Sequence, residues 1–420
     1  MKIIVAHPGK QHSYKTAVAI KKYNYLEKYI TTFYYKGSRK KINENLMKQS
    51  FFKRAWDRHC SDMDDCEVIT FYSNLFYILS FLLRFDRSKK IYRKVNDLLS
   101  DLFGKKVAYY AIKHQVDAVI MYDTTCDKCF DILKKEAPNI IRIQDVSAIN
   151  RIYMKSVYKQ DMVNSPEYSE ILMRERGFLF DSKNLNRWQR EIENTDYFIV
   201  PSKIVMESLV FSGIDKENVF ICPYGSNFYS IREKDYFENN KLNVIYVGNV
   251  TQMKGIFYLL DAFMELPESQ FSLTIVGLVD MNNELIKKYS SKVYFTGYVS
   301  HERVKDYLKK SDIFVFPSLG DSFGLSVLEA MAFGLPVVCS DHAGAADAIK
   351  NGYNGFVVSK GSKNEIKEKL ILCNNNRDLV RNMSHNALTT IKDYTWNNYE
   401  ANIGKAIDSI KVRKDERLLK

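Results

Sequence analysis

The sequence has few cysteines, and they follow no pattern. Seven cysteines occur in 420 residues. Their number is odd and their spacings are irregular, which argues against a disulfide framework and is typical of thiols kept in a reducing compartment. Cys126 and Cys129 form a single CxxC without a second pair or a nearby pair of histidines, whereas a structural zinc site needs about four ligands. We therefore expect free thiols and no metal.

Long apolar runs are also missing. The most apolar segment, residues 75–83, falls well short of the roughly 20 apolar residues that a membrane-spanning helix needs. The apolar run at residues 2–6 stops at a Pro-Gly turn and is too short for the core of a signal peptide. These two features predict a cytoplasmic protein without a spanning segment.

Low-complexity segments and internal repeats are absent as well, and a hydrophobic content of 46% is ordinary for a globular protein. The net charge is +12, and most of the basic excess lies in the first half of the chain. Such an excess favours a polyanionic ligand: nucleic acid, an anionic membrane or an acidic substrate. Because no nucleic-acid-binding module is recognisable, we expect no nucleic-acid partner.

What the sequence does contain is a repeated alternation of apolar, strand-like runs and helix-like segments. In the first series the expected strands are residues 2–6, 116–122, 140–143, 197–200 and 219–222, and the expected helices are 13–29, 127–135 and 203–211. In the second series the expected strands are 243–247, 272–276, 292–295, 313–316, 336–339 and 355–358, and the expected helices are 255–266, 301–310 and 325–333.

Continuous apolar strands indicate parallel sheets covered by helices on both faces. The sequence therefore predicts an α/β fold with two Rossmann-like βαβ domains facing across a cleft. The first domain is expected at residues 1–225 and the second at 226–395. A C-terminal helix at 396–420 is expected to pack back on the first domain. Ligands of such folds bind beyond the carboxyl ends of the strands.

The most informative segment is 316–340, which reads strand, loop, helix, turn, strand. Gly324 lies where the loop meets the helix. The first helical amides, near Leu325, lack intrahelical acceptors and carry partial positive charge, which suits a diphosphate or a sugar hydroxyl. Asp321 in the loop and Glu329 one turn into the helix suit sugar and ribose hydroxyls. Taken singly, these carboxylates would be a loop cap and a solvated helix residue; their joint spacing predicts a nucleotide-sugar pocket.

This spacing resembles glycosyltransferase family 4, the retaining, metal-independent GT-B enzymes also called glycosyl transferases group 1. The family has Glu-x7-Glu and then a small-residue stretch ending Gly-x-Pro-Val; this chain has Asp321-x7-Glu329 followed by AMAFGLPV. The resemblance implies that Asp321 contacts the donor sugar and Glu329 the ribose. Aspartate in place of the first glutamate is shorter but keeps the charge. The other donor-binding residues implied here are Phe323, Gly324 and Leu325.

A second match is residues 246–255, YVGNVTQMKG. The family usually has Gly-Arg, a short loop and Lys-Gly, with both cations on the donor phosphates. Lys254 and Gly255 are present, but Asn249 stands at the arginine position. The bidentate, charge-assisted hydrogen bonds of an arginine to phosphate are therefore lost. The resemblance implies that Lys254 neutralises the leaving diphosphate, which is the role of a metal in the other glycosyltransferase fold. We expect no cofactor, the nucleotide sugar being a substrate.

Weaker matches place further residues at strand ends. The segment 296–300 resembles the strand end whose backbone, around Val299, contacts the nucleotide base. In the loop after the first strand, Gly9 permits close approach of a ligand and Lys10 suits a phosphate. Asp145 falls where the family often has a cleft His or Asp that faces the sugar. For Lys10 and Asp145 an ordinary surface role is equally open. Four histidines show no partner pattern and are interpreted as ordinary polar residues: His12, His59, His114 and His301.

The segment 71–110 mixes aromatic and aliphatic residues with many Lys and Arg. This composition suits a helix lying on an anionic membrane surface. It equally suits a core helix with snorkelling basic ends. Both interpretations stay open.

Taken together, the sequence predicts a retaining hexosyltransferase. It would move a hexosyl group from a UDP- or GDP-sugar to a sugar hydroxyl of a growing glycan, including lipid-linked acceptors, in bacterial surface polysaccharide or lipopolysaccharide synthesis. Asp321, Lys254 and Asp145 are the candidate catalytic residues. Two alternatives remain: a nucleotide-sugar epimerase with a similar fold, and a non-catalytic GT-B partner subunit, which Asn249 and Asp321 keep open.

Overall fold

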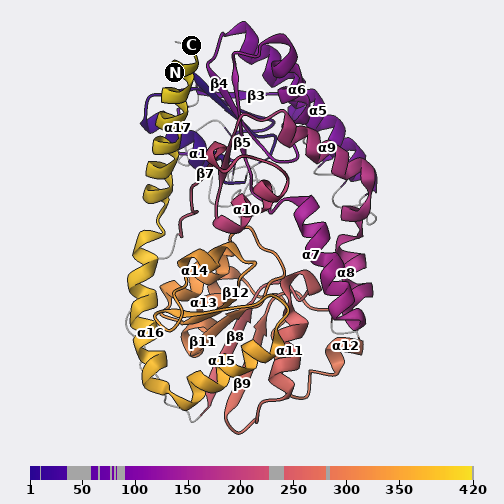
Figure 1. The fold of residues 1–420 in the computed structure, drawn as a ribbon, viewed down its shortest axis with the longest axis vertical. Coiled ribbons are helices and arrows are strands. Elements are labelled where there is room, and N and C mark those ends of the chain that lie inside the picture. The colour runs from indigo at the N-terminus through magenta and orange to yellow at the C-terminus, as the bar shows by residue number, and fades with distance from the viewer. Residues whose placement is uncertain are drawn as a thin grey trace, which may run out of the picture.

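The protein is organised around two parallel β-sheets, which lie in the upper and lower halves of Figure 1. This computed structural model describes residues 1–9, 11–35, 58–64, 67–75, 78–79, 82, 90–226, 241–280 and 284–418. Lys10 and residues 227–240, which follow the expected domain boundary, lie outside the described residues.

The first sheet has seven strands in the order β3-β2-β1-β4-β5-β6-β7, and all its pairings are parallel. The strands are β1 (Ile3–Ala6), β2 (Leu26–Thr31), β3 (Val68–Thr70), β4 (Ala118–Tyr122), β5 (Ile141–Asp145), β6 (Tyr197–Val200) and β7 (Val219–Ile221). The helices of this half are α1 (Ser13–Lys22), α5 (Lys90–Lys113), α6 (Asp127–Glu136), α7 (Arg151–Asn164), α8 (Ser169–Arg176), α9 (Ser182–Glu193) and α10 (Lys203–Phe211). β1, β4 and β6 are buried throughout, which explains their unbroken apolar sequences. β5 is equally buried but carries Arg142, Gln144 and Asp145.

The second sheet has six parallel strands in the order β10-β9-β8-β11-β12-β13. The strands are β8 (Leu242–Val247), β9 (Phe271–Val276), β10 (Tyr294–Phe295), β11 (Ile313–Phe316), β12 (Val337–Ser340) and β13 (Gly355–Val358). The helices are α11 (Ile256–Met264), α12 (Glu284–Lys287), α13 (His301–Lys310), α14 (Leu325–Ala332), α15 (Lys363–Asn375), α16 (Arg377–Thr390) and α17 (Trp396–Leu418).

The expected fold class is confirmed, and most expected elements recur within a few residues of their predicted ends. One helix was predicted wrongly. The segment 13–29 is not a single helix, because α1 ends at Lys22, Asn24 adopts a left-handed φ of 58° and β2 begins at Leu26. Because β2 pairs with β1, sheet hydrogen bonding determines the conformation from Leu26 onwards, and the local helical preference does not. The structure also contains elements that the sequence pattern did not predict, among them β3, α7, α8 and α9.

Helices bridge the two described halves on opposite sides of Figure 1. On one side α17 returns from the second half and packs along α1, where Lys22 pairs with Glu400. On the other side α7 and α8 reach down to the second half. Asp161 of α7 accepts hydrogen bonds from the Tyr258 hydroxyl (2.5 Å) and the Gln252 amide (2.9 Å). Residues of the first half are therefore anchored on the second sheet's helices.

The six cysteines among the described residues are free thiols, and five of them are buried. Within that same set of residues no group of three or more His, Cys, Asp or Glu side chains is placed to hold a metal ion. No described helix is long and apolar enough to cross a membrane. In the segment 71–110, Phe103 and Val107 of α5 are buried in a core cluster, as a core helix requires, while residues 83–89 lie outside the described part.

Candidate functional site

Two loops meet at the carboxyl edge of the second sheet, one after β8 and the other after β11. The Leu319 amide donates to the Met253 carbonyl at 3.1 Å, which ties the loops together. Gly255 makes this approach possible. Its φ is 64°, and a Cβ there would lie 1.9 Å from the Pro317 carbonyl oxygen. Only glycine fits, because any side chain would collide with backbone.

Lys254 and Asp321 form an ion pair across these two loops. Their side chains are 23% and 15% exposed, so the pair is partly shielded from solvent but still reachable. The other oxygen of Asp321 accepts from the Phe323 amide at 3.1 Å, and the Lys254 Nζ lies 5.5 Å from the Phe316 ring centroid. The structure thus brings together the two candidate residues expected to carry donor chemistry.

The N-terminus of α14 opens beside this pair. Gly324 has a φ of 85°, which turns the chain into the helix, and Leu325 is 46% exposed. Glu329 is half-buried on the next turn, with the Nε2 of His301 3.6 Å from its Oε1. Burial raises the pKa of Glu329, and the nearby His301 opposes that rise. His301, interpreted from the sequence as an ordinary polar residue, therefore lies beside a candidate donor-binding residue.

Asn249 and Val299 lie at the same edge of the sheet, after β8 and β10. The side chain of Asn249 is exposed, and its backbone carbonyl accepts from the Tyr246 hydroxyl at 3.0 Å. Val299 is half-buried against the core. The donor-side candidates therefore follow β8, β10 and β11 along a single edge of the sheet, where the switch-point rule places ligands.

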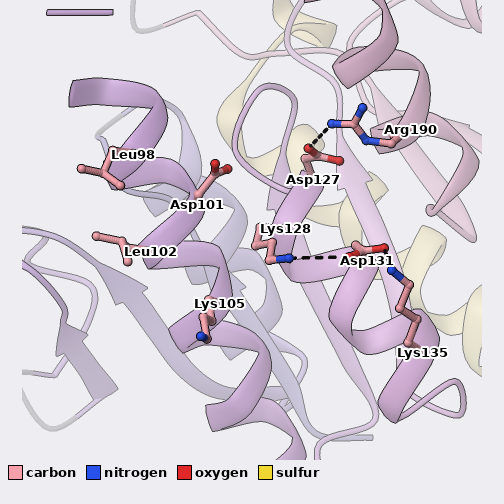
Figure 2. Close-up of a pocket in the computed structure, with 9 residues that line it drawn as sticks. All are labelled: Leu98, Asp101, Leu102, Lys105, Asp127, Lys128, Asp131, Lys135 and Arg190. Atoms are coloured by element: carbon pink, nitrogen blue, oxygen red, sulfur yellow. Dashed lines mark hydrogen bonds and ion pairs between the residues drawn. The ribbon is translucent and has the colours of Figure 1, made fainter. Parts of the chain in front are cut away.

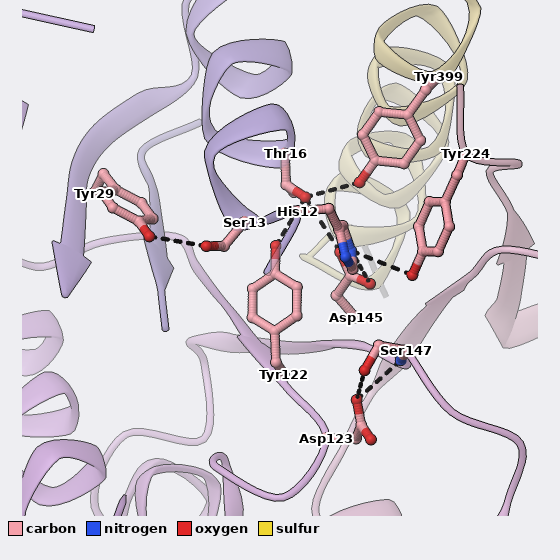
Figure 3. Close-up of polar contacts among 10 residues, drawn as sticks. All are labelled: His12, Ser13, Thr16, Tyr29, Tyr122, Asp123, Asp145, Ser147, Tyr224 and Tyr399. Carbon is pink, nitrogen blue, oxygen red and sulfur yellow. Dashed lines mark hydrogen bonds and ion pairs between the residues drawn. The ribbon is translucent and has the colours of Figure 1, made fainter. Parts of the chain in front are cut away.

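The first half contributes a buried polar cluster, shown in Figure 3. The Nε2 of His12 lies 3.0 Å from both carboxylate oxygens of Asp145, which is 1% exposed. The Thr16 hydroxyl donates to the same carboxylate at 3.2 Å and is itself within 2.8 Å of the hydroxyls of Tyr122 and Tyr399. Asp145 is therefore a buried partner of His12, and the interpretation of His12 as an ordinary polar residue is wrong.

Tyr399 lies on α17, so the C-terminal helix completes this cluster. Tyr224 links the cluster to the donor side. Its ring centroid lies 4.5 Å from that of His12 and 5.2 Å from that of Phe323. Phe323 is 2% exposed. The Phe323 side chain therefore packs between the two halves, while its backbone amide donates a hydrogen bond to Asp321.

The loop after β1 is tightly folded. The Gly9 amide donates to the Nδ1 of His7 at 2.8 Å, and a Cβ at Gly9 would lie 2.8 Å from the same imidazole ring. Burial lowers the pKa of His7 to about 4, so the ring is neutral and accepts this bond. Gly9 thus lies at the carboxyl edge of the first sheet.

Glu175 of α8 was missed by the sequence analysis. Its two carboxylate oxygens accept from the backbone amides of Gln252 and Met253, both at 3.0 Å. These amides belong to the short 3-10 turn that ends at Lys254. No sequence motif signals this contact, because the partners lie 77 and 78 residues apart.

A hollow of about 570 Å³ lies elsewhere, between α5, α6 and α9 (Figure 2). Its charged side chains largely satisfy one another: Arg190 bonds Asp127 at 2.9 Å, and Lys135 pairs with Asp131 at 2.6 Å. It contains none of the candidate residues from the sequence. The strand-end site is therefore chosen as the functional site for the chemistry of its side chains and not for its volume.

The family model for glycosyl transferases group 1 matches residues 228–390, which include the loops carrying Lys254, Asp321 and Glu329. An uncharacterised glycosyltransferase of Methanocaldococcus jannaschii is 28% identical over 220 residues, covering 49% of this chain and 56% of that protein. The capsular polysaccharide biosynthesis glycosyltransferase CapM of Staphylococcus aureus is 27% identical over 216 residues, covering 46% and 56%. The alignments thus span little more than half the length of these relatives.

The fold extends further than the sequence similarity. The crystal structure of HepE from Anabaena in complex with UDP matches with a TM-score of 0.61 at 16% identity, covering 97% of this chain and all of that one. At this identity the match establishes the fold. The two parallel sheets and the C-terminal helices are those of the GT-B fold.

Proposed function

Because the chain belongs to the glycosyl transferases group 1 family, we propose that it transfers a hexosyl group from a nucleoside diphosphate sugar to a sugar hydroxyl, with retention at the anomeric carbon. The observation that carries the proposal is the Lys254–Asp321 ion pair beside the N-terminus of α14. A cation, helix amides and a carboxylate at one strand end supply what a sugar diphosphate needs.

In this proposal the ion pair is exchanged when the donor binds. The Lys254 ammonium group then pairs with the diphosphate, which frees Asp321 to accept hydrogen bonds from the donor sugar. Stabilising the departing diphosphate supplies the electrostatic contribution that usually dominates such reactions. Lys254 and the amides at Gly324 and Leu325 do this without a metal.

Other strand ends hold the nucleotide. Glu329 accepts hydrogen bonds from the ribose hydroxyls, and Val299 contacts the base through its backbone. Asn249 offers a neutral hydrogen-bond donor at the position where the family pattern has an arginine. Because the arginine is absent, Lys254 bears most of the positive charge on the phosphates. Gly9 borders the donor from the first half.

Asp145 acts indirectly. Both its oxygens lie within hydrogen-bonding distance of His12, and its burial leaves no free carboxylate for covalent attack on the sugar. Its role is to hold the His12 ring towards the cleft. This is consistent with front-face attack, which needs no enzyme nucleophile.

The donor is UDP- or GDP-linked, and the UDP complex of the HepE structure favours UDP. The acceptor is a growing surface glycan, free or lipid-linked, as the capsular relative suggests. The six free thiols suit the reducing cytoplasm, where the reaction would take place. For lipid-linked acceptors, basic residues of the segment 71–110 would meet the inner membrane face.

A screen of UDP, GDP and ADP sugars tests the proposal. A bound donor raises the melting temperature by mass action, and the stabilising donor is then supplied with glycan acceptors. Transfer that is lost in both Glu329→Ala and Lys254→Ala, with the fold intact, supports the proposal. Near-normal turnover in both variants contradicts it. A donor sugar changed without acceptor identifies an epimerase, and donor binding without any turnover identifies a non-catalytic partner.

A further inference from the structure

The segment that follows β12 holds the backbone of Asp321 from both sides. The Asp321 amide donates to the His342 carbonyl at 2.9 Å, and the Asp321 carbonyl accepts from the Gly344 amide at 2.8 Å. Gly344 lies so close to the Asp321 loop that a Cβ there would be 2.1 Å from the Ser322 carbonyl oxygen. Residues 342–344 therefore fix the position of the backbone from which the Asp321 carboxylate extends.

His342 is held in turn by a side chain of the first half. Its Nε2 lies 3.0 Å from the hydroxyl of Tyr153 on α7, and the two rings are stacked with an interplanar angle of 16°. Its Nδ1 lies 2.8 Å from Oδ1 of Asp341. Because a carboxylate oxygen accepts, Nδ1 carries the proton, and the Nε2 of the neutral ring accepts from the Tyr153 hydroxyl. The ring cannot turn without breaking one of these two hydrogen bonds.

Two further contacts join the first half to the same place. The Ser202 hydroxyl donates to the Ser322 carbonyl at 2.7 Å, and the Lys203 amide donates to Oδ2 of Asp347 at 2.7 Å. His342 is only 8% exposed, so its hydrogen bonds form where little water competes for them. The Asp321 loop, the segment 341–347 and the first half of the chain therefore meet at one closely packed junction.

The position of Asp321 matters because the donor sugar of the proposed reaction needs a carboxylate at a defined place. A displacement of about 1 Å can lower a rate roughly 10²-fold. Among the described contacts at this junction, that of Tyr153 with His342 is the one between side chains of the two halves. It holds His342 at its ring, and the carbonyl of the same residue holds Asp321.

We propose that Tyr153 is a positioning residue for Asp321 and acts through His342. The inference rests on the proposed function, since that function assigns to Asp321 the contact with the donor sugar. The path runs from the Tyr153 hydroxyl to the His342 ring, and from the His342 carbonyl to the Asp321 amide. It does not include Glu329, which is assigned to the ribose. Removing the Tyr153 hydroxyl should therefore weaken binding of the donor sugar and leave binding of the nucleoside diphosphate unchanged.

Three variants of the full chain test this path. Tyr153→Phe removes the hydroxyl and keeps the ring that stacks on His342. His342→Asn keeps an amide donor for Asp341 but is too short to reach the Tyr153 hydroxyl. Tyr109→Phe is the matched control, because this tyrosine of α5 is 45% exposed and its hydroxyl lies 3.5 Å from Glu136.

Each protein is titrated with UDP and with UDP-glucose by calorimetry. Where the donor screen selects another sugar nucleotide, that compound and its nucleoside diphosphate replace the pair. Amide hydrogen exchange is followed by mass spectrometry in peptides that cover residues 318–324 and 341–347. The comparison of the two ligands isolates the contribution of the sugar, which a general loss of structure would not do.

In Tyr153→Phe and His342→Asn we expect faster exchange in both peptides. Affinity for the sugar nucleotide should fall roughly fivefold, the loss expected for one neutral hydrogen bond, while affinity for UDP stays the same. Tyr109→Phe should match the wild type throughout. Unchanged exchange overturns the inference, as does an equal loss of affinity for both ligands or no loss for the sugar nucleotide. A wild type that binds neither ligand counts against the proposed function instead, and faster exchange in the variants would still support the path to Asp321.

Discussion

The Nε2 of His12 lies 3.0 Å from both carboxylate oxygens of Asp145, although the two residues are 133 positions apart. β1 and β5 both flank β4 in the first sheet, and their carboxyl ends face the same edge. The sheet therefore brings a loop histidine and a strand-end aspartate into hydrogen-bonding contact. This pair and the Lys254–Asp321 pair occupy the corresponding edges of the two sheets.

Asp145→Asn tests whether this pairing matters for transfer. Asparagine keeps the size but has only one side-chain oxygen, so His12 loses one of its two carboxylate contacts and turns more freely. We expect transfer to fall at least tenfold while UDP affinity stays unchanged, measured by product formation and calorimetry. Asp131→Asn, which removes a partly exposed partner of Lys135 on α6, should leave both unchanged. Full activity of Asp145→Asn would refute a role for the pair.

Lys254→Met should remove most of the stabilisation of the leaving diphosphate. Methionine keeps much of the aliphatic stem but carries no charge, and loss of one such interaction commonly costs about 10²–10³ in rate. We expect that loss in kcat together with weaker UDP binding. Lys287→Met, which alters an exposed lysine of α12, serves as control. Unchanged UDP affinity in Lys254→Met would show that the phosphates bind elsewhere.

Glu175→Gln tests the two hydrogen bonds by which Glu175 holds the 3-10 turn that ends at Lys254. The carboxylate accepts from two backbone amides, whereas a glutamine offers one oxygen and sets an NH₂ against the second amide. We predict roughly tenfold weaker UDP binding with a small loss of melting temperature. Glu170→Gln on the same helix changes an exposed carboxylate and should have no effect. A fall in stability without a fall in affinity would make Glu175 purely structural.

Stability should depend on pH through Glu191. Its pKa in the folded protein is about 8, against an ordinary value of 4.5. Between these values the folded state holds a proton that the unfolded state has lost, so this residue's contribution decreases as pH rises, by at most about 1.4 kcal/mol per unit. Glu191→Gln should therefore flatten the decline measured by thermal unfolding from pH 6.5 to 8. His7 acts in the opposite sense below that window: its pKa of about 4 makes stability fall as pH drops below 6.5. Parallel curves for wild type and Glu191→Gln would contradict the prediction.

Much of the fold was predictable from the sequence, because strands buried on both faces and their glycine turns leave continuous local patterns. β6, α10, α13 and β13 have the expected bounds. The end of α1 was not predictable in this way. Local helical preference runs past Lys22, and only pairing with β1 assigns Leu26–Thr31 to a strand.

The sequence by itself determined the donor-side candidates. Lys254, Asp321, Gly324 and Glu329 belong to two short segments whose spacing depends on a strand, a loop and a helix start, all local features. The tertiary structure alone decided their partners: Asp321 on Lys254, His301 on Glu329, His12 on Asp145 and Glu175 on the Lys254 turn. These contacts join loops from different strands, and the sequence separation between partners follows from the order of the strands rather than from any local pattern. The contact between Tyr153 and His342 has the same origin, since its partners lie 189 residues apart and meet only in the packed fold.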